Sequence, residues 1–597
     1  MSRSPSRKLF QPHRIIAAGL CAATFVGCGG KSETSLRVDP ATLVVKAEAV
    51  AAQAATRFDG STLSADGTSI AFTVYAPSIA VGNSAPLVIT GPGWGNTRLT
   101  NLDTAPLDTL ELVQQGAKVA LEEGPQGGPA TTRGWYVIAF DQRGFGQSGG
   151  VANVQDPNIE SKDVSAIISW AEKNLPRLAF RKAPDGTLDP VVGGIGGSYG
   201  GGFQTIGAGV DKRIDAIVPA VTWYNLATSL FEKPKSMWTA LLFTPKTTPA
   251  MQQALTDGFM VGKVNESFLT EIYQHSPASY CEGKSTRMSQ PTIPGFYIQG
   301  TGDTLFPLNE GVSNYECNRK ANSNSKFLAI RGWHYYDGAV STAPKANLGG
   351  NISCNGAALN LARLQFSFLA QNLVDSRLDA SASSRYSTLP DVRTVLDDGK
   401  TFKATGESTE GACFEMTAAS ANPAGQVFTR GGTAFTAQIG EVTAGLPVSL
   451  SALITAAPLA LITSPEFAAL LQVDAAKVVE LMPATSVKRT IVGIPTASLT
   501  VAAATARDNS LNAPIIYVGL ARIRADGTRE LLHDQVVPVE GFGKKTITLG
   551  GLSTLLLPGE RIGAVVYGFH PQYYQVYSRV PVNVTVTDLT VNLPVVQ

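Results

Sequence analysis

Short apolar runs alternate with amphipathic stretches along the first part of the chain. One stretch between them, 162–175 (KDVSAIISWAEKNL), repeats its apolar positions at the helical period. Apolar strands separated by helices are typical of a mostly parallel sheet that is covered on both faces. The pattern therefore predicts an α/β domain. We expect its strands at 69–77, 85–93, 135–144, 190–197, 216–223, 295–303 and 326–334.

The pattern changes near residue 375. All six tryptophans lie at or before Trp333, and the chain beyond 375 is rich in Val, Thr, Ala and Gly. A chain of 597 residues also exceeds the ~250–300 residues at which a single core stops growing. Within the C-terminal part, 415–490 is an unusual insertion with a helix expected at 465–482. The expected organisation is a leader over 1–28, a linker over 29–59, the α/β domain over 60–375 and a β-rich domain over 376–597.

The leader has the pattern of an export signal. Four basic residues precede the apolar run IIAAGLCAATFVG, which is too short to span a bilayer comfortably. The run ends at FVGCGG, which resembles the lipobox of bacterial lipoproteins, although Phe25 stands where leucine is usual. The resemblance implies a lipid on Cys28, and Gly29 after it implies the outer membrane of a Gram-negative bacterium. An ordinary secretory signal, which would leave a periplasmic or secreted protein, is the alternative.

Charge and cysteine content narrow the range of functions. Lys and Arg number 48 against 47 Asp and Glu, so the chain offers no electrostatic basis for binding nucleic acid. Beyond the leader lie Cys281, Cys317, Cys354 and Cys413, and disulfides are permitted in an exported chain. We favour Cys317 with Cys354, while the other pairings and free thiols stay open. No cysteine or histidine spacing indicates zinc, and we expect no metal.

A glycine-rich stretch follows the expected strand at 190–197. It reads GIGGSYGGGF and places Ser198 between Gly196 and Gly200. A serine that stands clear at the end of a strand needs a strained backbone, and side chains two positions away would collide with it. The residues that follow, GFQTIGAGV, can open a helix. The pattern predicts a nucleophilic serine on a tight turn, and a flexible surface loop is the alternative.

A nucleophilic serine needs a base, and the base needs an orienting acid. Asp303 follows the strand GFYIQGTG and His334 follows FLAIRGW, so both come after the serine and at strand ends. We expect these two residues to be the acid and the base. His275 is the rival base, but it lies in a helical stretch. Asp337 is the alternative acid, and Asp141 precedes the serine and is expected to shape a loop.

Four stretches in chain order carry a family resemblance: FDQRGFGQSGG, GGSYGG, GTGDTLFP and GWHYYDG. They resemble the α/β-hydrolases, and more narrowly the cocaine-esterase and X-Pro dipeptidyl-peptidase-like (S15-type) serine hydrolases. STLSADGTSIAFTVYAPS is similar to the first hairpin of that family. Stretches within 490–595 are similar to its closing β-sandwich, a jelly-roll-like domain. The resemblance covers most of 60–375 and implies an α/β-hydrolase core followed by a β-sandwich.

The chain departs from this family at one point. The family uses a tyrosine hydroxyl after the second strand to hold the oxyanion, whereas this chain has Trp94 there, in GPGWGNTR. The same stretch resembles the HGxG loop of other hydrolases, in which the residue at Trp94 contributes its backbone N–H. The turn after Ser198 presents the backbone N–H of Tyr199. We therefore expect an oxyanion hole from Trp94 and Tyr199, and Trp94 can also pack at the pocket rim.

The stretch 222–290 falls between two core strands, and we expect it to form a helical cap over the serine. Its aromatic residues are candidates for an apolar acyl pocket, and packing within the cap is the alternative. These residues are Trp223, Tyr224, Phe231 and Trp238.

Together these features predict an exported serine hydrolase that cleaves carboxylic esters through an acyl-enzyme and needs no cofactor. The alternative is an X-Pro dipeptidyl-peptidase-like enzyme, for which Glu232, Glu266 or Glu271 of the cap would hold the substrate amine. A non-catalytic surface lipoprotein is more distant, since a retired enzyme is expected to lose a triad group. The expected partner is a small ester or peptide, with membrane contact only through Cys28. The sequence indicates no oligomeric state.

Overall fold

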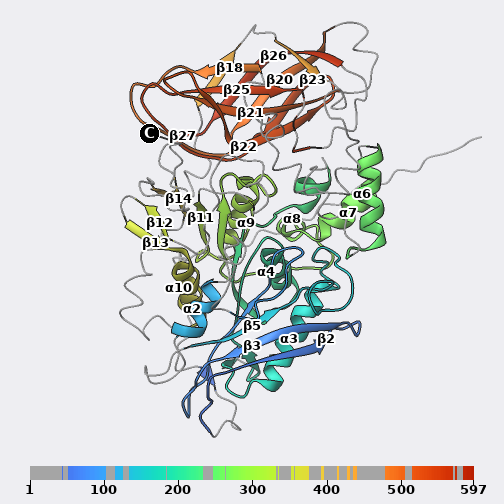
Figure 1. The fold of residues 1–597 in the computed structure, drawn as a ribbon, viewed down its shortest axis with the longest axis vertical. Helices are drawn as coiled ribbons and strands as arrows, with labels where there is room; N and C mark the ends of the chain where they lie inside the picture. The colour runs from blue at the N-terminus through green and yellow to red at the C-terminus, as the bar shows by residue number, and fades with distance from the viewer. Residues whose placement is uncertain are drawn as a thin grey trace, which may run out of the picture. The chain divides into compact units, whose positions relative to one another are not determined.

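The computed structural model (Figure 1) describes a large part of the chain. The leader over 1–28, with Cys28, lies outside the described residues. Among the described residues, no helix is both long and apolar enough to cross a lipid bilayer. The described residues are 43–44, 51–101, 115–124, 134–182, 185–232, 246–261, 264–330, 334, 351–354, 357–374, 392–395, 413–415, 426–430, 435–439, 477–504, 514–568, 570, 572–573 and 582–596.

The α/β part is built on one mixed sheet with the strand order β15-β14-β11-β10-β9-β8-β4-β5-β3-β2. Neighbours from β5 to β14 in this order run parallel, whereas β2, β3 and β15 pair antiparallel. The predicted α/β fold with a mostly parallel sheet is confirmed. The strands are β2 (Thr56–Leu63), β3 (Ser69–Ala76), β4 (Leu87–Thr90), β5 (Tyr136–Phe140), β8 (Val192–Gly197), β9 (Ile214–Ala220), β10 (Phe296–Gly300), β11 (Lys326–Ile330), β14 (Val392–Val395) and β15 (Cys413–Glu415).

Helices cover both faces of this sheet (Figure 1). A Cβ on Gly193 of β8 would contact Leu369 and Leu373 of α10, whereas a Cβ on Gly194 would contact Gln204 of α4. Because successive residues of a strand point to opposite faces, α10 and α4 lie on opposite sides of the sheet. Helix α2 packs against α10, and α3 against α4. The helices are α2 (Gln115–Glu123), α3 (Glu160–Asn174), α4 (Tyr199–Val210), α9 (Leu308–Ala321) and α10 (Leu361–Leu373).

Double coverage explains the composition of the central strands. Every residue of β4, β5, β8 and β10 is buried, so most of their positions carry apolar or small side chains. Burying one Val, Leu or Ile side chain contributes about 1.5–3 kcal/mol. The resulting core holds the carboxyl ends of the parallel strands in place, and those ends carry the expected site residues.

Two strands of the sheet come from beyond residue 375. Residues 392–395 (β14) pair parallel with β11, and residues 413–415 (β15) pair antiparallel with β14. Both lie C-terminal to the boundary expected near 375, at which the tryptophans stop. The change in composition there does not mark the end of the sheet.

The stretch 222–290, expected to form a helical cap, contains short helices between β9 and β10. Asn265 begins one of them, α7, by accepting a hydrogen bond from the Phe268 N–H (2.8 Å), which is a typical N-cap contact. The described elements are the π-helix η2 (Ala227–Phe231) and the α-helices α6 (Pro249–Val261), α7 (Glu266–Gln274) and α8 (Pro277–Cys281).

The C-terminal part consists of antiparallel sheets. One has the order β16-β26-β20-β23, with β17 also on β26; the others have the orders β18-β25-β21-β22 and β24-β19-β27. Alternate residues Ile516, Val518 and Leu520 of β21 enter one apolar core together with Leu499 and Val501 of β20. Two sheets that bury alternate side chains between them form a β-sandwich, as the sequence predicted.

The strands of the C-terminal part are β16 (Gln426–Arg430), β17 (Phe435–Ile439), β18 (Lys477–Met482), β19 (Arg489–Gly493), β20 (Thr496–Ala503), β21 (Ile515–Ile523), β22 (Arg529–Glu540), β23 (Gly543–Thr548), β24 (Leu552–Leu556), β25 (Arg561–Tyr567), β26 (Val582–Leu593) and β27 (Val595–Val596). Smaller elements elsewhere are the sheet β1-β6-β7 (Leu43–Val44, Phe180–Lys182, Leu188–Pro190) and the hairpin β12-β13 (Asn351–Cys354, Ala357–Asn360).

The helix expected at 465–482 is wrong over its last part. Residues 477–482 form β18, which pairs antiparallel with β25. Its sequence, KVVELM, fits a helix or a strand by apolar spacing alone. The β-branched Val478 and Val479 and the available edge of β25 favour the strand.

Candidate active site

Ser198 lies between the end of β8 and the start of α4. Its backbone has φ 55° and ψ −121°, a left-handed conformation that non-glycine residues rarely adopt. A Cβ on Gly196 would lie 2.5 Å from the Gly200 carbonyl oxygen, and a Cβ on Gly200 would lie 2.2 Å from that of Gly91. Only glycine fits at positions 196 and 200. The turn is therefore as tight as a strand-to-helix nucleophile turn requires.

Three expected site residues come together at the carboxyl ends of the strands. The Ser198 hydroxyl donates to Nε2 of His334 (2.8 Å), and Nδ1–H of His334 donates to Oδ2 of Asp303 (2.9 Å). All three side chains are buried, with exposed fractions of 5%, 2% and 0% for Ser198, His334 and Asp303. With its Nδ1 proton held by the carboxylate, the imidazole can accept the serine proton at Nε2.

The Asp303 carboxylate is fixed by further donors. Its Oδ1 accepts the backbone N–H groups of Leu305 (3.0 Å) and Phe306 (2.8 Å). Its Oδ2 also accepts from the side-chain amide of Gln299 (3.0 Å), which in turn donates to the Phe306 carbonyl (2.7 Å). Sequence reasoning missed Gln299, although a polar residue in the apolar strand FYIQG is a signal that could have identified it. These contacts orient the carboxylate toward His334.

The two residues expected to form an oxyanion hole lie side by side. The loop that carries Trp94 packs on the nucleophile turn, since a Cβ on Gly200 would also meet the Pro92 carbonyl at 3.2 Å. The rings of Trp94 and Tyr199 are 4.9 Å apart, edge to face. Tyr199 is the first residue of α4, and the first N–H of a helix has no acceptor within it. That N–H is available to a ligand.

The Trp94 indole has an unusual environment. Its ring also packs edge to face on Phe145, with centroids 5.0 Å apart. Its Nε1–H is buried and has no hydrogen-bond partner among the described residues. A buried donor without a partner is costly. Trp94, which stands where the similar family has a tyrosine, therefore has an indole N–H that can donate a hydrogen bond to a bound ligand.

A buried polar network supports this region, and sequence reasoning missed it. The Gln142 side chain donates to the Pro92 carbonyl (2.6 Å), which holds the loop of Trp94. Gln155 donates to Gln142 (2.5 Å) and lies 3.4 Å from the Tyr199 carbonyl. Val154 and Gln155 both have φ 59°, and strain of this kind persists where neighbouring structure enforces it.

Glu160 lies beside the Tyr199 hydroxyl. Its carboxylate accepts the backbone N–H of Asp156 (2.9 Å) and that of Asn153, and the Tyr199 hydroxyl lies 3.4 Å from it. Burial raises the pKa of Glu160 to about 7. A carboxyl that changes protonation near neutral pH therefore touches the residue expected to hold the oxyanion.

The expected pocket aromatics are distributed over two clusters. Trp223 and Phe231 share a buried cluster with Tyr199 and Phe306, and the Phe306 ring is 5.4 Å from that of His334. Tyr224 instead packs with Ile206, Tyr280, Met288 and the two cysteines Cys281 and Cys317. Trp238 lies outside the described residues. Trp223 and Phe231 remain pocket candidates, whereas Tyr224 packs elsewhere.

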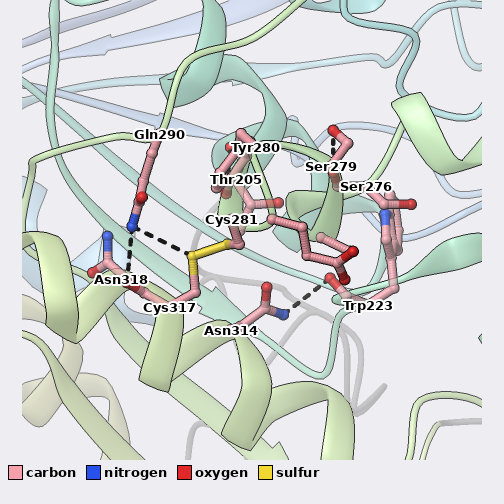
Figure 2. Close-up of a disulfide and its surroundings, with 12 residues drawn as sticks. Thr205, Trp223, Ser276, Ser279, Tyr280, Cys281, Gln290, Asn314, Cys317 and Asn318 are labelled. Carbon is pink, nitrogen blue, oxygen red and sulfur yellow. Dashed lines mark hydrogen bonds between the residues drawn. A yellow bond between two sulfur atoms is a disulfide. The ribbon is translucent and has the colours of Figure 1, made fainter. Parts of the chain in front are cut away.

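The disulfide of the described part differs from the expected one. Cys281, at the end of α8, is bonded to Cys317 of α9, with Cα atoms 5.8 Å apart (Figure 2). The favoured pairing of Cys317 with Cys354 is therefore wrong. Figure 2 shows Gln290 donating to the Cys317 carbonyl (3.0 Å) and Asn314 of α9 donating to the Trp223 carbonyl (2.9 Å). The disulfide ties the end of the cap to the helix that follows Asp303.

The carboxylates considered as anchors for a substrate amine have other partners or are exposed. Glu271 accepts two hydrogen bonds from Arg287 (2.6 and 2.9 Å) and lies 3.4 Å from His275. Hydrogen bonds from His275 and Arg287 lower the pKa of Glu271. Glu232 and Glu266 are exposed. The charge of Glu271 is thus already balanced within the protein.

Glu271 and His275 also belong to a group of potential metal ligands. Asp156, Glu271 and His275 offer ligand atoms within 4.8 Å of one another. Arg287 already donates to Glu271, and it lies 3.7 Å from Asp156. The guanidinium thus supplies positive charge where a metal ion would sit.

His275, the rival base, contacts the Val154 carbonyl through Nδ1 (3.2 Å), whereas the Ser198 hydroxyl faces His334. Asp141 is buried and accepts the backbone N–H groups of Arg98 (2.6 Å) and Gln147 (2.8 Å), as a loop-shaping residue would. Asp337 lies outside the described residues.

Comparison with known proteins identifies one matching family and several similar chains. Residues 66–336 match the model of the X-Pro dipeptidyl-peptidase (S15) family. Two Escherichia coli proteins, each described as an uncharacterized 31.7 kDa protein in the traX-finO intergenic region, are 34% and 33% identical over 88 residues, or 15% of this chain. The chain spans about a quarter (27%) of the length of these curated relatives.

Solved structures share the fold. A CocE/NonD family hydrolase from Staphylococcus aureus has a TM-score of 0.57 at 14% identity, covering 91% of this chain and 94% of its own. An α-amino acid ester hydrolase has a TM-score of 0.58 at 14% identity, covering 96% and 100%. An aminopeptidase from a marine sediment Thaumarchaeota archaeon has a TM-score of 0.53 at 12% identity, covering 91% and 97%. Residues 66–336 thus match the S15 family model, and the chain has the fold of these CocE-type and ester hydrolase structures.

Proposed function

We propose that this chain is a serine hydrolase that cleaves carboxylic esters through an acyl-enzyme. The observation that carries the proposal is the continuous chain of hydrogen bonds from the Ser198 hydroxyl through His334 to Asp303. Buried side chains in this order can make a serine nucleophilic without any other group.

The reaction follows from the positions of these atoms. As the Ser198 oxygen attacks the ester carbonyl, Nε2 of His334 takes its proton, and Asp303 stabilises the imidazolium that forms. The carbonyl oxygen becomes an anion that accepts the backbone N–H groups of Trp94 and Tyr199. Each such donor typically contributes about 3–4 kcal/mol to transition-state stabilisation. As the carbonyl re-forms, the bond from the carbonyl carbon to the alcohol oxygen breaks, and the imidazolium gives its proton to that oxygen, so that the alcohol leaves and the acyl group stays on Ser198.

Water completes the cycle by the same chemistry. His334 removes a proton from a water molecule, which attacks the acyl carbonyl, and the Ser198 oxygen leaves and regains its proton.

A second candidate is an X-Pro dipeptidyl-peptidase-like serine peptidase, which the family match over 66–336 favours. An enzyme of that kind must hold the free amine of its substrate. Among the cap carboxylates considered, Glu271 is paired with Arg287, and Glu232 and Glu266 are exposed. We therefore place ester cleavage first.

The test compares the two substrate classes directly. Initial rates are measured on a short-chain nitrophenyl ester and on alanyl-prolyl nitroanilide, with Ser198→Ala as the blank. Ester turnover that the variant loses, without anilide cleavage, supports the proposal. Strong anilide cleavage would assign the protein to the peptidases. Equal rates for the variant and the parent on both substrates would overturn the assignment of the nucleophile.

We further propose that the chain is exported and lipidated at Cys28. The disulfide between Cys281 and Cys317 supports export, because such bonds persist in oxidising compartments. The test is labelling with an alkyne fatty acid in a Gram-negative host, followed by membrane fractionation. Cys28→Ser should lose both the label and the membrane association; an unlabelled parent protein would contradict lipidation.

A further inference from the structure

We infer that Gln535, from the C-terminal β-sandwich, is a positioning residue for the catalytic acid Asp303. The inference rests on the proposed function, since it assigns a role within the same triad. The two residues are 232 positions apart in the chain. It gives the β-sandwich a direct part in the geometry of the active site.

The contact is a hydrogen bond to the backbone of the acid. The Gln535 side-chain amide donates to the Asp303 carbonyl oxygen at 2.8 Å, and Gln535 is only 6% exposed. Within the hydrolase domain, Thr301 N–H donates to the Ile330 carbonyl (2.9 Å), which anchors the start of the same turn to β11. Gln535 thus holds the turn at the residue whose carboxylate orients His334.

A distortion of β22 aims Gln535 at the turn. The pairing of β22 with β21 shifts register between Gly519, opposite Val536, and Ala521, opposite Leu531. The residues of β22 between these two pairs bulge out of the ladder. His533 and Asp534 in the bulge have φ 54° and 55°, which non-glycine residues rarely adopt. Bulges of this kind re-aim side chains and are common beside active sites.

Neighbouring residues of the β-sandwich hold the bulge in place. The side chain of Gln572 donates to the Asp534 carbonyl (2.7 Å). The Tyr573 hydroxyl donates to the Val536 carbonyl (3.2 Å), directly after the bulge. These hydrogen bonds hold the backbone of the bulge in its strained conformation. Strain of this kind is often found at functional positions.

Two glycines make room for Gln535. A Cβ on Gly550 would lie 2.6 Å from the Gln535 Cβ, and a Cβ on Gly519 would lie 2.6 Å from the Gln535 carbonyl oxygen. Any other residue at these positions would displace Gln535. The close fit restricts the direction in which the Gln535 amide points. The amide in turn fixes the position of the Asp303 carbonyl oxygen to which it donates.

The same interface provides a matched control. Asn309 of α9 donates to the Leu549 carbonyl (3.0 Å) and accepts the Gly551 N–H (2.7 Å). These contacts also join the two domains, but they do not touch the turn of Asp303. Removing Asn309 weakens the interface, whereas removing the Gln535 amide also releases the catalytic acid.

The experiment compares Gln535→Met, Asn309→Ala and the parent full-length protein. Methionine keeps the length of glutamine and removes its donor. Since small displacements of a catalytic group cost up to about 100-fold in rate, we expect Gln535→Met to lower kcat by about 10- to 100-fold with little change in KM. The acid limb of its kcat/KM profile should move to lower pH, because a less well oriented carboxylate stabilises the imidazolium less.

Asn309→Ala should lower Tm but leave kcat within about twofold and the pH profile in place. If Gln535→Met loses no more kcat than Asn309→Ala, or keeps the parent pH profile, the positioning role is wrong. Should Gln535→Met not fold, Gln535→Glu serves instead, because it keeps the shape and donates only when protonated. Its kcat relative to the parent should then recover as pH falls, and an unchanged ratio contradicts the inference.

A fluorophosphonate probe separates this inference from the proposed function. The probe reacts with an activated serine whatever the natural substrate is. A parent protein that neither reacts at Ser198 nor cleaves esters refutes the proposed function and, with it, the inference. A parent protein that reacts, together with a Gln535→Met variant that reacts equally fast, refutes the positioning role alone.

Discussion

The α-carbon of Gly200 faces the carbonyl oxygen of Gly91 so closely that a Cβ would lie 2.2 Å from it. The contact joins the first turn of α4 to the loop that leads to Trp94. The nucleophile turn and the loop of the second expected oxyanion donor are thus packed backbone to backbone. No side-chain rearrangement can relieve an added methyl group there.

Gly200→Ala is therefore expected to destabilise the protein by about 3 kcal/mol and to reduce ester turnover at least 100-fold, by roughly the loss of one oxyanion donor. Gly207→Ala is the control in the same helix, since its Cβ would meet only Ile214 at an ordinary 3.4 Å. That variant should be unchanged or more stable by up to about 1 kcal/mol. Thermal unfolding and ester rates measure both. Equal behaviour of the two variants would contradict the close packing.

Asp303→Asn should lower kcat by roughly 10³- to 10⁴-fold while changing Tm little. The amide keeps the size of the carboxylate but favours the imidazole tautomer that cannot accept the serine proton. Steady-state kinetics on the nitrophenyl ester measure the loss, with Ser198→Ala as the background. A loss smaller than tenfold would remove Asp303 from the triad and direct attention to Asp337.

Glu160 should make stability depend on pH in an identifiable direction. Burial raises its pKa from 4.5 to about 7, so the folded state keeps a proton that the unfolded state has released. The stability that this carboxyl contributes is present below pH 4.5 and is lost as pH rises to about 7, a decline of up to about 3 kcal/mol. Glu160→Gln cannot ionise and should lack the decline.

Urea unfolding of the parent and of Glu160→Gln at pH 5 and pH 8 measures this effect. The difference in unfolding free energy should move in favour of the variant at the higher pH. Asp215 also has a pKa raised to about 7 by burial, but it is present in both proteins and cancels in the difference. A difference that is the same at both pH values would show that Glu160 does not titrate in this range.

The disulfide should contribute measurably to stability. Its cysteines are 36 positions apart, and closing a loop of that length in the unfolded chain is worth about 4 kcal/mol in the chain-entropy model. The double variant Cys281→Ala, Cys317→Ala should unfold at lower temperature than the parent. Reductant should lower the Tm of the parent and not that of the variant. If reductant shifts both alike, another thiol is responsible.

The glycines around Ser198 and the strand-end positions of Asp303 and His334 could be predicted, because each follows from the sequence close to it. Gly196 and Gly200 follow from the steric demands of one turn, and the chain around Ser198 shows them together. Asp303 and His334 could be placed because the carboxyl ends of parallel strands meet at one edge of the sheet. The apolar strands themselves follow from burial on both faces.

Features that depend on distant parts of the chain could not be predicted in this way. Gln535 contacts Asp303 across 232 positions, and nothing near either residue indicates the partner. Cys281 could be matched with Cys317 only once α8 and α9 were placed beside each other. Residues 477–482 became a strand because the edge of β25 was available, which their own sequence does not reveal.

The strands β14 and β15 set a limit on how this protein can be divided. They complete the hydrolase sheet from beyond residue 375, so a chain cut at 375 would leave the backbone of β11 without that neighbour. An open strand edge is a template for pairing with another molecule. A catalytic domain that is expressed by itself should therefore extend to Glu415, because one that ends at the compositional change would expose this edge and aggregate.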